Sequence, residues 1–408
     1  MKKILLIIFT LMVCSVTLAQ RDSSLFKRIA VDTAGLLMNM DAVYSRPAVQ
    51  IGKIPVNVGG YVELNSAYVS RDGIAEGLSF QIPRLTLFIS SSIRDRIKFL
   101  TEIEFEEGGK EISIEFASVD IELHPLLNIR GGIVMNPIGS FNQNHDGPKW
   151  EFIDRPLSAT TIIPATWSNV GAGIYGKLAK GDWVWAYELY ATNGFDDKII
   201  NNSQNRTWMP ASKDNRERFT ESFNGVPLIT GKTAIRNVGL GELGISWMGG
   251  VYNMFRSEGI KLDKKRSVDF VALDYNTKIP FIKTYINAEW VWAFVDIPDT
   301  YTEQFGNRQQ GGFIDIVQPL VKKRLLGWNG ASINLAVRAE YADYNVGYFR
   351  QAGGRIYDEV VAVVPGISFR PSGQTVFRIN YRREWQRDLL GNPPAKLAAI
   401  QIGLSTYF

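Results

Sequence analysis

The last residues of the chain read Ala398-Ala399-Ile400-Gln401-Ile402-Gly403-Leu404-Ser405-Thr406-Tyr407-Phe408. Successive side chains of a β-strand point to opposite faces of its sheet. In this stretch one face carries apolar residues and the other polar or small ones, namely Ile400, Ile402, Leu404 and Phe408 against Gln401, Gly403 and Ser405. Thr406 interrupts the apolar row. The stretch therefore predicts a strand with one apolar face that ends on an aromatic residue.

The same alternation recurs from about residue 55 to the end, in segments of roughly ten residues separated by turn residues. Aromatic residues make up 12% of the chain, which also contains 37 glycines. After residue 20 no stretch approaches the ~18 apolar residues of a membrane-spanning helix. Alternation suits a transmembrane barrel, whose lipid face must be apolar while its lumen face can be polar. A soluble antiparallel sheet alternates as well, so other features must decide.

The end of the chain is the first such feature, because a final strand that stops on an aromatic residue resembles the recognition signal of bacterial outer-membrane proteins. Connection length is the second. Tight turns are expected at Arg94-Asp95, His124-Pro125, Ala179 to Asp182, Leu240-Gly241, Ile279-Pro280, Leu325 to Asn329 and Pro371 to Gly373. Longer polar connections lie between them, notably residues 136 to 165, 194 to 230 and 296 to 308. This alternation predicts a barrel with one periplasmic and one external rim.

Aromatic residues gather near the ends of predicted strands. Two groups each share one strand face, Trp183, Trp185 and Tyr187 in one and Trp290, Trp292 and Phe294 in the other. Aromatic rings favour the membrane interface, so girdles are expected there. The alternative is that these rings pack the core of a soluble sandwich. We favour the girdle, because it agrees with the connection lengths.

These features together predict an all-β, transmembrane, antiparallel barrel of about sixteen strands over residues 55 to 408. Both termini are expected on the periplasmic side, with one long loop inserted. A barrel of this size is wide enough for an aqueous channel. Residues 20 to 54 lie outside the pattern and are expected to form an N-terminal periplasmic segment, either a short helix or an extra strand.

The first nineteen residues have the layout of a signal peptide. Lys2 and Lys3 precede an apolar run, and the small residue Ala19 precedes Gln20. Cleavage is therefore expected after Ala19, with export across the inner membrane of a Gram-negative cell. A lipoprotein acylated at Cys14 is the alternative.

Charge and cysteine content exclude several classes. The formal net charge of +4 is too small to indicate nucleic-acid binding. Cys14 is the single cysteine, and with cleavage after Ala19 it is expected to leave with the signal peptide, so disulfides and thiolate metal sites are not expected. There are two histidines and no HExxH spacing. Neither an enzyme nor a cofactor is therefore expected.

Charged residues on the polar faces of the strands are expected to line the pore. They carry both signs: Arg84, Arg96, Lys98, Arg338, Arg378 and Arg382, with Glu102 and Glu340. Rows of arginine attract anions and acidic rings attract cations. The arginines therefore favour an anion path, and the glutamates, joined by Glu63, Glu188 and Glu289, oppose it. The alternative is that these charges pair with one another and give no solute preference.

The loop over residues 136 to 165 is the candidate constriction. Charged and polar residues in it could face the solute, namely His145, Lys149, Asp154 and Arg155. Trp150 and Phe152 are candidate anchors that would hold the loop inside the barrel. The alternative is an ordinary exposed loop on the cell surface.

Several short motifs resemble the porin O and P family of phosphate-selective porins, in the form common in Bacteroidetes. They are Gly60-Tyr61-Val62-Glu63, Asn144-His145, Trp150-Glu151-Phe152, Asp154-Arg155-Pro156-Leu157 and the terminal Tyr407-Phe408. The resemblance spans about residues 55 to 408. It implies a sixteen-stranded, trimeric pore whose inserted loop follows the fifth strand. Family members that select phosphate use stacked arginines and lysines, from which the inward glutamates of this chain depart.

The resulting prediction is an outer-membrane porin for passive diffusion of small hydrophilic solutes. A preference for anions or phosphate is the finer expectation. The expected partners are outer-membrane lipid, small anions or other small solutes, and two further copies of the chain in a homotrimer. The alternative is a barrel that serves as a structural or docking partner in an envelope complex, with an incidental lumen.

Overall fold

A computed structural model describes residues 26–28, 37–51, 55–93 and 96–408. The predicted signal peptide lies outside the described residues. Most of the described chain is β-strand. The barrel strands are β3 (Val56–Arg71), β4 (Ile74–Gln81), β5 (Arg84–Ser92), β6 (Ile97–Glu106), β7 (Glu111–His124), β8 (Leu127–Met135), β9 (Ser168–Lys180), β10 (Trp183–Thr192), β11 (Leu228–Asn237), β12 (Gly241–Val251), β15 (Ser267–Lys278), β16 (Tyr285–Val295), β17 (Arg308–Leu325), β18 (Trp328–Asp343), β21 (Glu359–Ser372), β22 (Thr375–Gln386) and β23 (Ala395–Tyr407).

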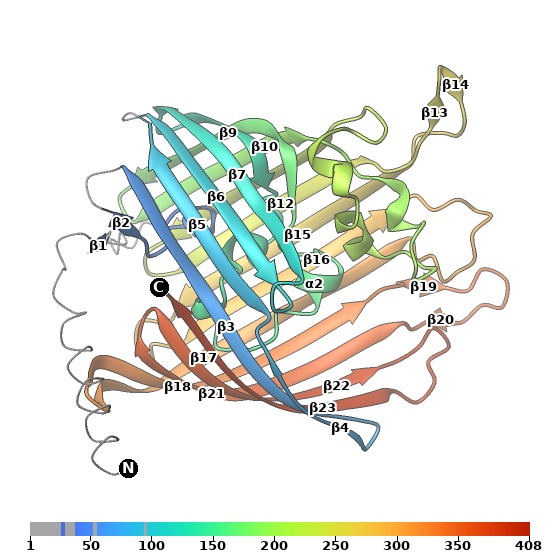
Figure 1. The fold of residues 1–408 in the computed structure, drawn as a ribbon. Coiled ribbons are helices and arrows are strands. Elements are labelled where there is room, and N and C mark those ends of the chain that lie inside the picture. The colour runs from blue at the N-terminus through green and yellow to red at the C-terminus, as the bar shows by residue number, and fades with distance from the viewer. Residues whose placement is uncertain (1–25, 29–36, 52–54, 94–95) are drawn as a thin grey trace, which may run out of the picture.

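The sheet closes on itself (Figure 1). Each barrel strand pairs antiparallel with its neighbours, and the last strand, β23, pairs with the first, β3. Both β4 and β5 pair with β3, so they act as one bent strand. Pro83 lies at the bend, where its missing N–H breaks no ladder bond. The result is a closed barrel of sixteen antiparallel strands, which confirms the predicted fold class.

The remaining elements are small. They are β1 (Phe26–Arg28), β2 (Val49–Ile51), β13 (Arg256–Ser257), β14 (Ile260–Lys261), β19 (Gly347–Tyr348), β20 (Arg355–Ile356), the 3-10 turns η1 (Asn39–Asp41), η2 (Asn142–Asn144), η3 (Gly147–Lys149), η4 (Asp197–Ile199), η5 (Met209–Lys213) and η6 (Arg216–Phe219), and the helix α2 (Ser158–Thr161). No helix in the described ranges is long and apolar enough to span a membrane. The hairpins β13–β14 and β19–β20 mark one end of the barrel, and β1, β2 and the C-terminus mark the other (Figure 1).

Connections alternate in length as expected. At the end with the C-terminus they are short, over 125–126, 181–182, 238–240, 279–284, 326–327 and 373–374. The expected turn at 94–95 lies outside the described residues. At the other end five are long, over 136–167, 193–227, 252–266, 296–307 and 344–358. In barrels of this kind the short turns face the periplasm, so the C-terminus lies at that end.

The two faces of the wall differ as the alternation predicts. On β23 the outward Ile400 and Ile402 are 53% and 55% exposed, whereas the inward Gln401 is 7% exposed. Trp183 and Trp185 point outward near the periplasmic end. A single closed sheet with its large apolar side chains outside is not a sandwich, so that alternative is wrong. The outward band is instead the surface that meets lipid.

Candidate functional site

The interior of the barrel is polar and charged, but it is not an open tube at mid-height. Five inward charged side chains, from strands on different parts of the wall, are at most 3% exposed: Glu102, Glu188, Glu289, Arg338 and Arg378. A sixteen-stranded barrel has room for an aqueous channel. Here two inserted segments fill that room, a loop at residues 136–167 and an N-terminal segment at residues 38–48.

The inserted loop follows β8, the fifth strand of the barrel when β4 and β5 count as one. It crosses the lumen to strands far from its own ends. The backbone N–H groups of Ser140 and Phe141 donate to one carboxylate oxygen of Glu289 on β16, at 2.7 and 2.9 Å. Gly139 has a φ of +66°, and a Cβ there would meet that carboxylate. Glycine is therefore the residue that lets the loop approach the wall so closely.

Arg378 on β22 holds the other side of the loop. Its Nη1 donates to the carbonyl oxygens of Gly147, Trp150 and Phe152, at 3.2, 3.2 and 2.6 Å. Its Nε and Nη2 have no hydrogen-bond partner. Within the described chain Arg378 also forms no ion pair, in contrast to the neighbouring Arg382, which pairs with Glu340 at 2.9 Å. Arg378 is thus a buried cation with two donors unused.

The sequence predicts a periplasmic location for residues 20 to 54, but residues 38–48 lie inside the barrel. The peptide N–H of Asn39 donates to the carboxylate of Glu242 on β12. Apolar side chains of the segment fill pockets in the wall: Met38 and Met40 pack against Val184, Ala186 and Ala234, and Val43 packs against Leu100, Phe116 and Met135. The segment contains one short helical turn, η1, and the strand β2 follows it, so each of the two alternatives for residues 20 to 54 describes a part of the chain.

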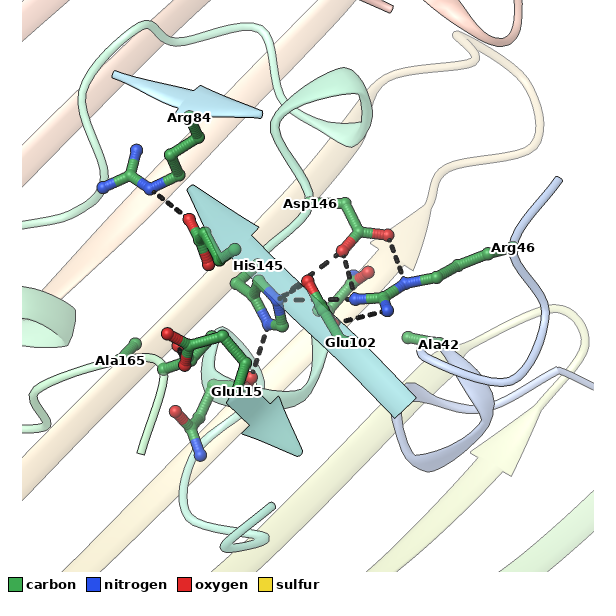
Figure 2. Close-up of polar contacts among 12 residues, drawn as sticks. Ala42, Arg46, Arg84, Glu102, Glu115, His145, Asp146 and Ala165 are labelled. Atoms are coloured by element: carbon green, nitrogen blue, oxygen red, sulfur yellow. Dashed lines mark hydrogen bonds and ion pairs between the residues drawn. The ribbon is translucent and has the colours of Figure 1, made fainter. Parts of the chain in front are cut away.

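Arg46 joins the segment, the loop and the wall (Figure 2). Its Nη1 lies 2.5 Å from a carboxylate oxygen of Glu102 on β6. Its Nη2 and Nε pair with both oxygens of Asp146 in the loop, at 2.5 and 2.9 Å. Tyr407 on β23 donates its hydroxyl to Asp146 at 2.6 Å. The Nε2 atom of His145 lies 3.4 Å from Glu102.

The charges in this cluster stabilise one another. Burial alone would raise the pKa of Asp146, but Arg46, Lys149 and His145 hold the pKa of that carboxyl well below its usual range. The carboxylate therefore stays ionised opposite the guanidinium. Burial is also the main reason that the pKa of Lys149 lies below its ordinary value.

Three of these residues could in principle hold a metal ion. Ligand atoms of Glu102, His145 and Asp146 all lie within 4.8 Å of one another. The Arg46 guanidinium, however, already pairs with both carboxylates at hydrogen-bond distance. A bidentate arginine satisfies both charge and geometry here, so the cluster fits an ionic anchor better than a metal centre.

Apart from Arg378, the predicted pore-lining residues fall into two groups. Five lie within the barrel and are paired: Arg84 with Glu63 and Glu104, Arg338 with Asp315, Arg382 with Glu340, and Glu102 with Arg46. Arg84 is partly buried and the other four are buried. Lys98 is half-exposed at the periplasmic rim and pairs with Glu122 at 2.6 Å. Arg96 precedes β6, in the turn, and is exposed. The lumen charges therefore largely compensate one another.

The predicted constriction residues all lie inside the barrel. His145 is buried, and the Lys149 amino group donates to the carbonyl of Ala42 at 3.1 Å. Asp154 accepts from Gln401 on β23 at 2.8 Å. Arg155 donates to the carbonyl of Ala165, within the same loop. The loop is thus folded into the lumen and is not an exposed surface loop.

Two cavities remain beside the inserted segments. One of about 390 Å³ lies between the N-terminal segment and the wall and is lined in part by Tyr44, Arg46, Lys98 and Arg130. The other, of about 350 Å³, lies between the loop and strands β16 to β21 and includes Trp150 and Arg370 in its lining. Their linings reach residues at the short-turn ends of the strands, such as Ser92 and Gly373. They form the periplasmic approaches to the filled section.

Sequence reasoning missed Arg46, which is the central residue of the cluster. Residues 20 to 54 show neither a strand nor a helix period, so no pattern indicated that Arg46 enters the barrel. It also missed Asp315 and Asp274, the partners of Arg338 and Lys232. Strand alternation could have placed both aspartates inside, because each shares a face with inward residues.

The closed barrel, its apolar outer band and its polar interior define the class of protein. The protein is a transmembrane β-barrel of the bacterial outer membrane.

Comparison with known proteins places the fold more closely. No family model matches the chain. The fold is similar to the anion-selective porin from Comamonas acidovorans (13% identity, TM-score 0.53, covering 86% of this chain and 99% of the porin). It is also similar to the outer membrane channel DcaP of Acinetobacter baumannii (13% identity, TM-score 0.52, covering 86% of this chain and 97% of the channel). A third similar structure is Salmonella typhi OmpF (11% identity, TM-score 0.53, covering 86% of this chain and 97% of OmpF). At such identities the likeness concerns the fold.

A sequence relative covers a shorter stretch. An uncharacterized protein of Aquifex aeolicus is 36% identical over 146 residues, which is 34% of this chain. The match spans about a third of that relative, 32% of its length. The chain is therefore porin-like in fold, and its particular activity is a matter for proposal.

Proposed function

We propose that the protein is an outer-membrane porin for passive diffusion of small hydrophilic solutes. The observation that carries the proposal is a sixteen-stranded barrel with a charged interior, crossed at mid-height by an inserted loop. A barrel of this width can hold an aqueous path, and a loop folded into it sets the size of what passes. The porin-like fold supports the same function.

A preference for anions or phosphate is the finer proposal, and Arg378 is the residue that supports it. Most charged groups in the lumen are paired, which favours weak selectivity. Arg378 keeps two donors free at a buried position. Buried guanidinium donors favour an anion, because anions satisfy both the charge and the hydrogen bonds.

Membership of the porin O and P family and a homotrimer are proposed with it. Both rest on the motifs in the loop and at the C-terminus. The loop's position after the fifth strand agrees with what that resemblance implies.

A docking barrel in an envelope complex is the second candidate. The filled section of the lumen favours it, because a barrel that never conducts has no need of an open path. A catalytic role is not proposed. His124 lies at a turn, where its Nδ1 accepts from the Leu126 N–H, and His145 is sealed inside the loop contacts.

The deciding experiment is single-channel recording of the refolded chain from residue 20 in a planar bilayer under a potassium chloride gradient. Stepwise conductance supports the porin. An anion-favouring reversal potential with block by added phosphate supports the finer preference, and oligosaccharides report the size limit. Well-folded protein that never conducts, together with co-purification of another envelope protein, would instead support the docking barrel.

A further inference from the structure

The N-terminal segment at residues 38–48 occupies the lumen without being part of the wall. Its described backbone hydrogen bonds to backbone are internal to it, such as Asp41 N–H to Met38 carbonyl. The ladder to the barrel begins only at β2, where Val49 and Gln50 pair with β3. The wall closes through the pairing of β23 with β3 and does not need the segment. The segment can therefore leave the lumen while the barrel stays closed.

Apolar packing and separate polar contacts hold the segment inside, without a backbone ladder to the wall. Val43 sits among Leu100, Phe116 and Met135. The Asp41 carboxylate pairs with Lys177 on β9 at 2.8 Å. Together with the contacts of Met38, Asn39 and Met40, these contacts reach wall strands from β6 to β15, and none of them belongs to a strand ladder.

Arg46 differs from these side chains because it binds the segment to both the wall and the inserted loop. It pairs with Glu102 on the wall and with Asp146 on the loop, and its guanidinium carbon lies 5.0 Å from the centre of the Phe88 ring. Glu102 and Asp146 are both fully buried. Without Arg46 these two carboxylates would lose the partner that they share, and only Lys149, 3.3 Å from Asp146, and the His145 ring would remain beside them, which is costly in a buried site. Arg46 is therefore the side chain that ties the segment, the loop and the wall together.

We propose that residues 38–48 are an intramolecular plug that closes the channel, and that Arg46 is the positioning residue that holds the plug in place. The inference rests on the proposed porin function and adds its regulation. Withdrawal of the plug joins the cavity of about 390 Å³ to the space that the segment occupied. The loop then remains as the constriction, with Glu102 and Asp146 facing the solute.

The first test compares the gating of two arginine variants in the refolded chain. Arg46→Ala should shift the closed-to-open ratio of single channels toward open by about a hundredfold, because one partner of a buried ion pair is lost. Arg266→Ala is the matched control, since Arg266 pairs with Asp263 and Asp296 at the loop end, outside the lumen. Its gating should equal that of the unaltered protein. Equal gating of Arg46→Ala would overturn the plug.

A second test remains valid even if the Arg46→Ala variant fails to fold. Cys14 is the single cysteine and precedes residue 20, so Val43→Cys introduces one thiol into the refolded chain. Val43 is 5% exposed. A bulky maleimide should react when the plug is out, and the enlarged side chain should then keep it out, so conductance rises in irreversible steps. Ser203→Cys, exposed in the 193–227 loop, should react without any change in conductance.

The outcomes separate the two proposals. Reaction at Val43→Cys that leaves conductance unchanged, or steady conductance without any reaction, would overturn the plug while leaving the porin intact. If every variant folds and none conducts, with or without maleimide modification, the proposed porin function itself would be overturned.

Discussion

At the residue scale, the interior is governed by which charges have partners. Arg338 illustrates the common case, with two bonds of 2.6 and 2.7 Å to Asp315. A bidentate pair of this kind is internally satisfied, so it offers little to a passing ion. Arg378 is the exception, because its partners are loop carbonyls. We therefore expect any solute preference to depend on Arg378.

Replacement of Arg378 tests this. Arg378→Gln should reduce any anion preference and lessen block by phosphate, since the unpaired cation is lost. Reversal potentials under a potassium chloride gradient measure the change. Arg383→Gln, on the outward face of the same strand, should keep the selectivity of the unaltered protein. An unchanged reversal potential in Arg378→Gln would assign the selectivity to other residues.

A second prediction concerns the glycine where the loop meets Glu289. Gly139→Ala should lower the free energy of unfolding by about 1–3 kcal/mol more than Gly181→Ala does. Both glycines have positive φ, +66° and +59°, but a Cβ at Gly139 would meet the Glu289 carboxylate, whereas one at Gly181 would meet nothing within 4 Å. Urea unfolding in lipid vesicles measures the difference. Equal losses would show that the carboxylate moves aside freely.

At the element scale, each strand has one face for lipid and one for the lumen, and the inserted segments have neither. The strands are held by continuous ladders to their neighbours. The loop is held by separate contacts, for example between the Ile153 N–H and Asn380 at 2.9 Å. The wall is therefore the rigid element, and the loop and plug are the elements that can differ between functional states.

The lipid face of the final strand gives an element-scale prediction. Ile402→Arg should cost about 2–4 kcal/mol of unfolding free energy if this part of β23 lies near the middle of the bilayer. Ile74→Arg, at the exposed start of β4, should cost about 0–1 kcal/mol. Ile402 and Ile74 are 55% and 74% exposed, so exposure alone does not separate them. Urea titrations in vesicles compare the two, and equal costs would contradict the assigned lipid band.

At the scale of the whole molecule, the barrel combines a complete wall with a filled centre. The wall resembles that of porins, while the centre is occupied by the loop and by residues 38–48. This combination is consistent with a channel that conducts only when part of its own chain moves. Any measured conductance should therefore be compared with that of the state in which the loop and residues 38–48 fill the lumen.

Assembly is the prediction at this scale. The protein in mild detergent should have the mass of a homotrimer, because the resemblance to the porin O and P family implies that state. Light scattering coupled to gel filtration, corrected for bound detergent, measures the mass. A monomer that still conducts would remove the trimer from the proposal and leave the channel standing.

The sequence by itself determined the wall. Alternation is a local property with a period of two, so residues such as Ile402 and Arg378 could be assigned to opposite faces without knowing their neighbours. The lengths of the connections then indicated a closed barrel with one rim of short turns. The residues of the constriction loop could be named for the same reason, since the loop stands out between two alternating segments.

Only the tertiary structure decided what fills the barrel and which charges meet there. Arg46 lies 56 positions from Glu102 and 100 from Asp146 along the chain. Contacts over such separations depend on the closure of the wall and on the path of two aperiodic segments, and neither leaves a periodic trace in the sequence. The strands, which alternate with a period of two, could therefore be predicted from the sequence, whereas the plug could not.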